Sequence, residues 1–379
     1  MSRAAGRLRL FARALPRLVL QRAGRLLGHR QRPAEVRRIL IAHHLLLGDT
    51  LMLTALLAKL RARYPAAAIA MTCPVPFVAL YSGKPYAVEA LPFNPHDAGT
   101  VSAILANGPY DLALVPGDNR HAWLALAAGS RWIVAHAGDT PDWKNWPVDE
   151  SVNYPDTPTA WSDMAAQLAD GPAAAPFRAS DWPMPAARSF ALPDQPYVVL
   201  HPGASTPLKH WPAARWTQLA DWLASRGLRP IWSAGAKEAA VVAAADPQQR
   251  YASYAGQLDL AQMSRLIANA NALVCPDTGI AHLGRVVGTP TLALFGPGSS
   301  VISGAGEFWR QCPFVALTER DFPCRDQTVL FRRHKDWIRR CGRSTRECGH
   351  ARCMDALGFE RVHDALQGLM ANGKALGKL

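Results

Sequence analysis

One segment in the second half of the chain constrains the fold more than any other. It predicts a buried strand at residues 272–275, a tight loop, a helix from about Thr278, and a second strand at residues 291–295. A helix that begins just after a parallel strand offers unpaired N–H groups and partial positive charge to an anion. Asp277 occupies the predicted N-cap position, and Gly279 lets the backbone approach a ligand. The segment therefore indicates a parallel α/β fold with either an anion site or an ordinary capped helix here.

The same alternation of strand and helix runs through the rest of the chain. Further strands are predicted at residues 38–42, 68–72, 87–91, 112–115, 132–135, 197–200, 229–233 and 251–255. Alternation of this kind is typical of parallel, doubly wound sheets. A proline-rich stretch at residues 171–196 divides the strands into two sets. We therefore predict two Rossmann-like α/β domains that face a central cleft.

The predicted division of the chain has four parts. They are a basic amphipathic leader (1–36), an N-terminal Rossmann-like domain (37–185), a C-terminal Rossmann-like domain (186–355) and a C-terminal helix (356–379). We expect the C-terminal helix to pack back on the first domain.

The positive charge is concentrated at the N-terminus. The chain of 379 residues carries a net charge of +13, and residues 1–34 contain nine Arg and no acidic residue. The remainder is only mildly basic and shows no nucleic-acid-binding motif, so we predict no nucleic-acid partner. Leucines between the arginines suit a helix on an anionic membrane surface. A transit peptide and an unstructured leader are the alternatives for residues 1–34.

The cysteines do not indicate a metal site. There are seven, and Cys324, Cys341, Cys348 and Cys353 lie close together in sequence, at spacings that match no zinc pattern. An odd number without a secretory signal favours a reducing compartment. Packed or free thiols and no bound metal are predicted, and a metal or redox site at this cluster is the alternative.

A first candidate site lies at the end of the first predicted strand. Gly48 allows a sharp turn there, and Asp49 stands at the start of the next helix. A carboxylate in this place is either a general base for a hydroxyl group or a helix cap.

Two further strand-to-helix loops suit a phosphorylated ligand. In the loop at residues 201–212, small residues including Ser205 and Thr206 expose backbone N–H groups, and Lys209 adds a mobile positive charge. The loop lacks the spacing of a P-loop or of the dinucleotide-binding fingerprint. The turn at residues 234–238 carries Glu238, which either accepts ribose hydroxyls or is an exposed residue favoured by the helix dipole.

Taken together and in order, these motifs resemble glycosyltransferase family 9. The motifs are Leu47-Gly48-Asp49, the loop of residues 201–212, the turn that ends at Glu238, the Asp277–His282 segment and Phe295-Gly296-Pro297. The resemblance implies a GT-B fold and an inverting, metal-independent transfer of a sugar from a nucleotide sugar. The best-known members transfer heptose from ADP-heptose to lipopolysaccharide. The absence of an Asp-x-Asp motif agrees with metal independence.

The resemblance also implies roles for single residues. Asp49 would be the base that deprotonates the acceptor hydroxyl, in an acceptor domain at residues 37–185. The domain at residues 186–355 would bind the donor through Lys209, Ser205, Thr206, Glu238, Asp277, Thr278, Gly279 and His282. No cofactor is implied beyond the nucleotide sugar.

The implied setting is the cytoplasmic face of a Gram-negative inner membrane, where the protein would be peripheral and use a lipid-linked glycan acceptor. Two other functions stay open from sequence. One is a nucleotide-sugar epimerase or hydrolase of the same fold, and the other is a non-catalytic nucleotide-sugar-binding protein.

Overall fold

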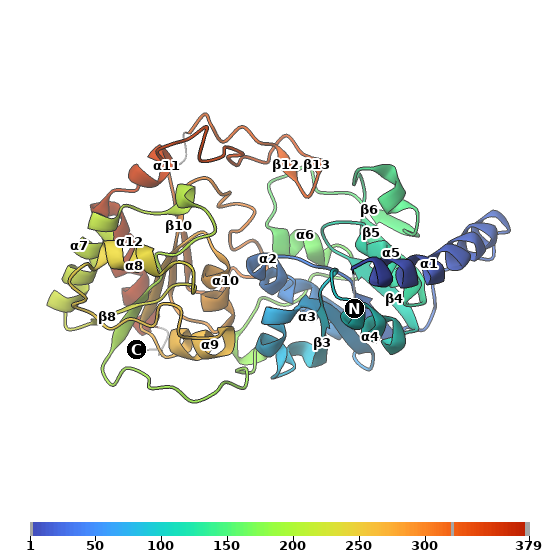
Figure 1. The fold of residues 1–379 in the computed structure, drawn as a ribbon, viewed down its shortest axis with the longest axis horizontal. Coiled ribbons are helices and arrows are strands. Elements are labelled where there is room, and N and C mark those ends of the chain that lie inside the picture. The colour runs from blue at the N-terminus through green and yellow to red at the C-terminus, as the bar shows by residue number, and fades with distance from the viewer. Residues whose placement is uncertain (1–2, 320–321, 376–379) are drawn as a thin grey trace. The chain divides into compact units, whose positions relative to one another are not determined.

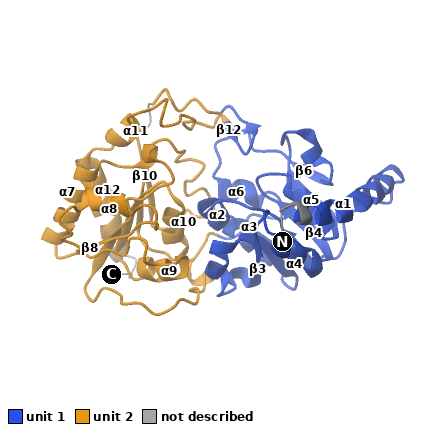
Figure 2. Cartoon of the chain, viewed as in Figure 1, with its two compact units in different colours: residues 1–175, 329–336 blue, residues 176–328, 337–379 orange. Residues whose placement is uncertain are grey.

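The computed structural model describes residues 3–319 and 322–375, which form two compact units (Figures 1 and 2). Unit 1 comprises residues 1–175 and 329–336, and unit 2 comprises residues 176–328 and 337–379. The chain leaves unit 1 at residue 175 rather than at the expected residue 185. Residues 329–336 belong to unit 1, although they lie within the predicted C-terminal domain at residues 186–355.

Unit 1 is built on six parallel strands in the order β3-β2-β1-β4-β5-β6. The strands are β1 (Arg38–Ile41), β2 (Ala68–Pro74), β3 (Val88–Phe93), β4 (Tyr110–Val115), β5 (Ser130–His136) and β6 (Glu150–Val152). The central strands β1 and β4 are apolar on both faces, as in sheets covered by helices on both sides. Strand order reverses between β1 and β4, and such sheets bind ligands beyond the carboxyl ends of the strands at this point.

Unit 1 contains six α-helices and several short 3-10 helices among the described residues. The α-helices are α1 (Arg3–Leu26), α2 (Leu47–Met52), α3 (Thr54–Arg63), α4 (Ala98–Asn107), α5 (His121–Ala127) and α6 (Trp161–Ala166). The 3-10 helices are η1 (Val75–Tyr81), η2 (Pro85–Ala87) and η3 (Asp142–Asn145). The single helix expected after β1 is divided at Leu53 into α2 and α3.

Helix α1 is part of unit 1 and not a separate leader. It lies beside α4 and α5 (Figure 1). Ala14 and Leu18 face these helices and are 0% and 6% exposed, within the apolar core of the unit. The alternative of an unstructured leader is therefore wrong for the described part of α1, because this helix buries an apolar face.

Arginines of the basic N-terminal segment hold α1 on unit 1. Arg17 donates to the main-chain oxygen of Ala127 at 2.8 Å, at the carboxyl end of α5. Arg25 and Arg30 pair with the buried carboxylate of Asp149 at 2.8 Å and 2.7 Å. A cation at a helix C-terminus is favourable, and a buried carboxylate requires partners of this kind. Part of the positive charge that was expected to contact a membrane is therefore paired with groups of unit 1 instead.

The opposite face of α1 remains apolar and uncovered by the described residues. Leu8, Leu15, Val19 and Leu26 lie on one side at helical spacing, and their side chains are 52–88% exposed. In the described part of the chain, no helix combines the length and the apolar character needed to cross a bilayer.

Residues 329–336 form a hairpin that a single arginine fixes to unit 1. Its two strands are β12 (Val329–Leu330) and β13 (Arg333–His334). All five N–H groups of the buried Arg333 donate hydrogen bonds, at distances of 2.7–2.9 Å. Their acceptors are oxygen atoms of Ala137, Gly117, Phe331, Asn119 and His136. The guanidinium group therefore links the hairpin to the loops that follow β4 and β5.

Unit 2 contains a second parallel sheet, of five strands in the order β11-β10-β9-β7-β8. The strands are β7 (Tyr197–Leu200), β8 (Arg229–Trp232), β9 (Ala272–Pro276), β10 (Thr291–Phe295) and β11 (Phe314–Thr318). The short strand expected at residues 251–255 is reduced to one bridge between Trp232 and Ser253.

Unit 2 contains six α-helices and two 3-10 helices among the described residues. They are α7 (Ala213–Ser225), α8 (Ala239–Ala245), α9 (Leu260–Ala268), α10 (Gly279–Val286), α11 (Arg352–Asp355), α12 (Phe359–Ala375) and the 3-10 helices η4 (Ala179–Asp181) and η5 (Pro207–Lys209). Helix α12 packs against α7, β10 and β11 through Val362, Leu366 and Leu369. The expectation that the C-terminal helix packs on the first domain is therefore wrong, because its apolar face completes the core of unit 2.

Candidate functional site

The loops after β7 and β9 meet at the reversal point of the unit 2 sheet. These strands are neighbours, and the chain leaves them toward opposite edges, which is where α/β sheets bind ligands. Lys209 follows β7 and Asp277 follows β9. The ammonium group of Lys209 lies 2.9 Å from Oδ2 of Asp277 and donates to the main-chain oxygen of Asp277 at 2.7 Å. The structure thus brings together two residues that the sequence places 68 positions apart.

The N-terminus of α10 lies directly behind this pair. Thr278 is the N-cap, with φ −139° and ψ 170°, and its side chain makes no cap hydrogen bond. The expectation that Asp277 is the N-cap is wrong, because its N–H donates to Leu294 at 2.9 Å and continues the sheet. From Gly279 onward, the first amides of α10 have no intrahelical acceptor. They offer an anion both hydrogen bonds and the positive end of the helix dipole.

His282 lies one turn into α10 and is 5% exposed. Burial, and then the charges of Arg285 and Lys209, hold the pKa of His282 well below its ordinary value. Its imidazole is therefore neutral, and among the described residues its Nδ1 has no hydrogen-bond partner.

Two glycines make room for the carboxylates of this region. A Cβ atom on Gly298 would lie 2.0 Å from Oδ2 of Asp277. A Cβ atom on Gly203 would lie 2.2 Å from Oε2 of Glu238. Any larger residue at either position would displace a carboxylate. The close approach of each loop to its carboxylate therefore requires glycine.

The remaining predicted donor residues lie on the loops after β7 and β8. Glu238 precedes α8, is half-buried and accepts a hydrogen bond from the N–H of Gly235 at 2.9 Å. Thr206 caps η5 by accepting from the N–H of Leu208 at 3.4 Å, and Ser205 is exposed.

A buried histidine that the sequence analysis assigned no role supports this edge of the sheet. Nδ1 of His201, at the end of β7, lies 2.9 Å from the hydroxyl of Ser233, at the end of β8. Burial lowers the pKa of His201 to about 4. A neutral histidine thus links the starts of the two loops that carry Lys209 and Glu238. No local pattern revealed it, because the contact joins two strands.

In unit 1, Asp49 lies beyond the carboxyl end of β1, at the reversal point of that sheet. It occupies the first turn of α2, whose N-cap is Leu46 and not Asp49. Asp49 is therefore not the N-cap of this helix, although it lies in the first turn, where the helix dipole favours an acidic residue. Its main-chain oxygen accepts from Nε1 of Trp161 at 3.3 Å, which ties α2 to α6. Asp49 is half-buried.

The described residues contain no cluster of three or more metal-ligating side chains with suitable geometry. All seven cysteines are free thiols. Burial raises the pKa of Cys353 and Cys341, so the protonated form is favoured.

Comparison with known proteins gives a family match. The model of glycosyltransferase family 9 (heptosyltransferase) matches residues 102–328. Lipopolysaccharide heptosyltransferase 1 of Pseudomonas aeruginosa is 32% identical over 214 residues, which are 52% of this chain and 58% of that protein. Lipopolysaccharide heptosyltransferase 1 of Salmonella typhimurium is 31% identical over 139 residues, which are 36% of this chain and 43% of that protein. The chain therefore spans about half the length of these relatives.

Among solved structures, the chain is similar to ADP-heptose lipopolysaccharide heptosyltransferase II of E. coli. The TM-score is 0.66 at 22% identity, and the match covers 89% of this chain and 99% of that protein. At this identity the likeness shows the fold, which is the two-domain α/β architecture predicted from sequence.

Proposed function

Because the chain belongs to glycosyltransferase family 9, we propose that it is an inverting, metal-independent glycosyltransferase. The proposed donor is ADP-heptose, and the proposed acceptor is the lipopolysaccharide core or a related lipid-linked glycan. The observation that carries the proposal is the contact of Lys209 with Asp277 beside the N-terminus of α10.

This arrangement suits a diphosphate leaving group. Cleavage of the bond between the sugar and the diphosphate leaves an electron pair, and thus negative charge, on a phosphate oxygen. Lys209 and the first amides of α10 stabilise that charge without a metal ion. Asp277 holds the ammonium group at this point, and in the proposal it also accepts from hydroxyls of the sugar. Glu238 binds the ribose hydroxyls, while Ser205 and Thr206 line the diphosphate loop.

Asp49 supplies the second half of the chemistry. Its carboxylate takes the proton from an acceptor hydroxyl as the oxygen attacks the anomeric carbon. The new C–O bond forms on the face opposite the departing diphosphate, so the configuration inverts. The position of Asp49 beyond β1 supports this role, because loops at this edge of a parallel sheet carry ligand-binding residues.

The outer face of α1 supports a peripheral membrane location. Leu8, Leu15, Val19 and Leu26 are exposed together on one side of this helix. A helix with such a face lies in the plane of a bilayer surface, and basic residues favour anionic lipid. We propose the cytoplasmic face of the inner membrane, where the lipid-linked acceptor would be presented.

The test compares Asp49→Asn with the wild type in transfer from ADP-heptose to a heptose-free lipopolysaccharide acceptor. Turnover is expected to fall by about 10²- to 10⁴-fold, because general-base catalysis contributes about this much. The thermal shift produced by ADP should be unchanged, since ADP contacts unit 2. Glu89→Gln removes an exposed carboxylate of unit 1 and should have no effect. Near-wild-type turnover of Asp49→Asn would refute the base assignment. Product formation without acceptor would instead indicate an epimerase or hydrolase, and no nucleotide binding would refute the enzyme proposal.

A further inference from the structure

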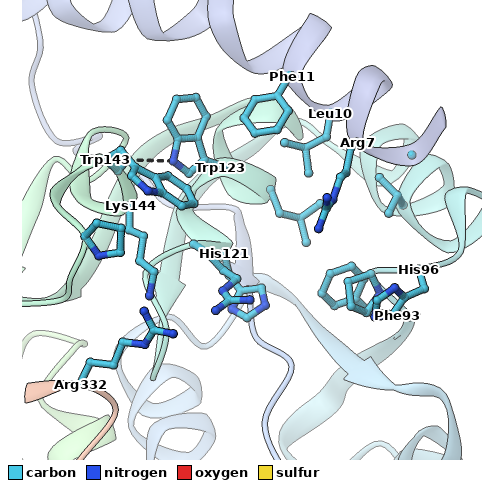
Figure 3. A pocket seen from close by; sticks show the side chains of 16 residues that line it. Arg7, Leu10, Phe11, Phe93, His96, His121, Trp123, Trp143, Lys144 and Arg332 are labelled. Atoms are coloured by element: carbon cyan, nitrogen blue, oxygen red, sulfur yellow. Dashed lines mark hydrogen bonds between the residues drawn. The ribbon is translucent and has the colours of Figure 1, made fainter. Parts of the chain in front are cut away.

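Unit 1 contains a cavity of about 540 Å³ to which no role has been given. Its volume is in the range of small-ligand sites. One wall is α1, through Arg7, Leu10 and Phe11. The other walls come from the loops after β3, β4 and β5 and from Arg332 of the hairpin (Figure 3).

Aromatic rings form an ordered apolar wall of this cavity. The rings of Phe11 and Trp123 meet edge to face at 5.5 Å, and Trp143 lies 6.4 Å from Trp123. Nε1 of Trp123 donates to the main-chain oxygen of Trp143 at 3.0 Å, which fixes the indole (Figure 3). Phe11 and Trp143 are 40% and 41% exposed. The wall is therefore rigid and still accessible.

The charge of the cavity is positive. Four cationic side chains line it, and no carboxylate does. Lys144 is neutralised by Asp118 at 2.9 Å and Asp139 at 3.0 Å. Arg7 makes no hydrogen bond or ion pair within the described residues, and Arg332 donates only to the main-chain oxygen of Thr140, at 3.2 Å. Arg120 pairs with Asp118 at 2.8 Å. The guanidinium groups of Arg7 and Arg332 thus keep uncompensated charge, one reaching from α1 and one from the opposite side (Figure 3).

The backbone at Arg332 is strained in a way that places this side chain in the cavity. Phe331 and Arg332 form the two-residue turn of the hairpin with φ values of 45° and 67°, a region that disfavours residues with a side chain. Arg333 holds the turn through its five hydrogen bonds, and the ring of Phe331 packs on Trp161 at 4.7 Å. Glycine or asparagine adopts such positive φ values at a lower energetic cost. The chain nevertheless has an arginine at this position, and its side chain brings a positive charge to the cavity.

The apolar wall continues onto the outer face of α1. Phe11 is three residues from Leu8 and four from Leu15, so the three side chains are neighbours on the helix surface. Leu8 and Leu15 are 73% and 52% exposed. A ligand with an apolar chain can therefore extend from the cavity along α1 without leaving apolar surface.

We propose that this cavity binds the anionic end of an amphiphilic acceptor, with a phosphate or carboxylate between Arg7 and Arg332 and the apolar part along Phe11 and α1. The proposal rests on the proposed function and deepens it, because it names the residues of unit 1 that would hold the anionic group and the apolar part of the proposed acceptor. Arg332 is then a specificity-determining residue that the hairpin brings to unit 1.

The test measures binding through the change in intrinsic tryptophan fluorescence, to which Trp123 and Trp143 of the cavity contribute among the twelve tryptophans of the chain. The probe is dodecyl phosphate below its critical micelle concentration. Dodecyl maltoside has the same chain without the anion, and glucose 6-phosphate has the anion without the chain. We expect dodecyl phosphate to bind at least tenfold more tightly than either, and added salt to weaken its binding. Equal binding of the maltoside would overturn the anion site, and equal binding of glucose 6-phosphate would overturn the amphiphile. Displacement by ADP would indicate a nucleotide site and overturn the proposal.

One variant in the turn, one on α1 and one control separate binding from folding. Arg332→Gly removes the guanidinium group and relieves the backbone strain, so the variant should be at least as stable as the wild type. Its Kd for dodecyl phosphate should rise at least tenfold, as should that of Arg7→Gln. Arg131→Gln, which removes a largely exposed arginine of unit 1 outside the cavity, should bind like the wild type.

Unchanged affinity in a folded Arg332→Gly would refute the proposal. The ADP thermal shift is read on the same samples and depends on unit 2. A preserved ADP shift together with no binding of dodecyl phosphate would overturn the acceptor cavity alone, and the proposed transferase would stand.

Discussion

At the scale of single residues, the candidate site of unit 2 depends on contacts that no local pattern contains. Lys209 and Asp277 lie on different strands' loops, yet their side chains meet at 2.9 Å. The pair fits only because Gly298 leaves space for the carboxylate. Lys209 is 23% exposed, so its charge is held at a defined place and can still reach a ligand.

A substitution of Lys209 tests this arrangement. Lys209→Gln should weaken ADP-heptose binding by about 10- to 100-fold, because a hydrogen bond to a charged group contributes about 1.5–3 kcal/mol. Isothermal titration with ADP-heptose measures the effect. Lys237→Gln changes an exposed lysine on a neighbouring loop and should bind like the wild type. Equal affinities of the two variants would contradict the role of Lys209.

At the scale of elements, two segments that look peripheral in sequence are built into unit 1. The hairpin of residues 329–336 is fixed by Arg333, which is 4% exposed and uses every N–H group that it has. Helix α1 is fixed by Arg25 and Arg30 on Asp149. Because the hairpin is anchored, the side chain of Arg332 lines the cavity. Because α1 is anchored by its other face, an apolar stripe is exposed on its outer face.

Replacement of Arg333 tests the anchoring of the hairpin. Arg333→Lys keeps the charge but cannot supply five N–H donors in a fork, so several buried oxygens lose their partner. The free energy of unfolding should fall by about 3 kcal/mol, the scale on which breaking a buried charged network acts. Urea denaturation measures this, with Arg346→Lys on an exposed loop as the control. A loss no larger than that of the control would show that the anchoring is weak.

The outer face of α1 is tested on vesicles. The double variant Leu15→Glu and Val19→Glu places two charges on the exposed stripe and leaves the packed face of α1 unchanged. We expect co-sedimentation with vesicles of phosphatidylglycerol and phosphatidylethanolamine for the wild type, and at least tenfold weaker binding for the variant. Val301→Glu changes an exposed apolar residue of unit 2 and should bind like the wild type. Equal binding of all three proteins would exclude α1 as the membrane surface.

At the scale of the whole molecule, buried histidines couple stability to pH. Burial lowers the pKa of His43 and His136 to about 3, and that of His121 and His201 to about 4. A histidine in the unfolded chain titrates near 6.5. Between these values the unfolded chain binds protons that the folded chain does not bind.

The free energy of unfolding should therefore be fully present above about pH 6.5 and fall as the pH drops toward 4. The slope is at most about 1.4 kcal/mol per pH unit for each histidine. Urea denaturation at several pH values from 7.5 to 4.5 measures it. His201→Asn should reduce the slope for unit 2, and His29→Gln, at an exposed position, should leave it unchanged. A flat profile would show that the buried histidines are already protonated in the fold.

The sequence by itself was enough to predict the two α/β units and to bring the loops of Lys209 and Asp277 to one edge of a sheet. Alternating strands and helices are local patterns, and the loops at the carboxyl ends of parallel strands lie along one edge of the sheet. Lys209 and Asp277 could therefore be assigned to one site before their distance was known. The motifs also identified the family, which the comparison confirmed.

Only the tertiary structure decided which segments complete each unit. Helix α12 joined the core of unit 2, α1 joined unit 1, and the hairpin at residues 329–336 returned to unit 1. An apolar face is buried, and a buried charge is hydrogen-bonded, only by partners that lie far away in the sequence. Arg333, for example, donates to the main-chain oxygen of Gly117, more than a hundred residues away. No local pattern reports such partners, so the cavity that Arg332 and α1 share could not be predicted from sequence.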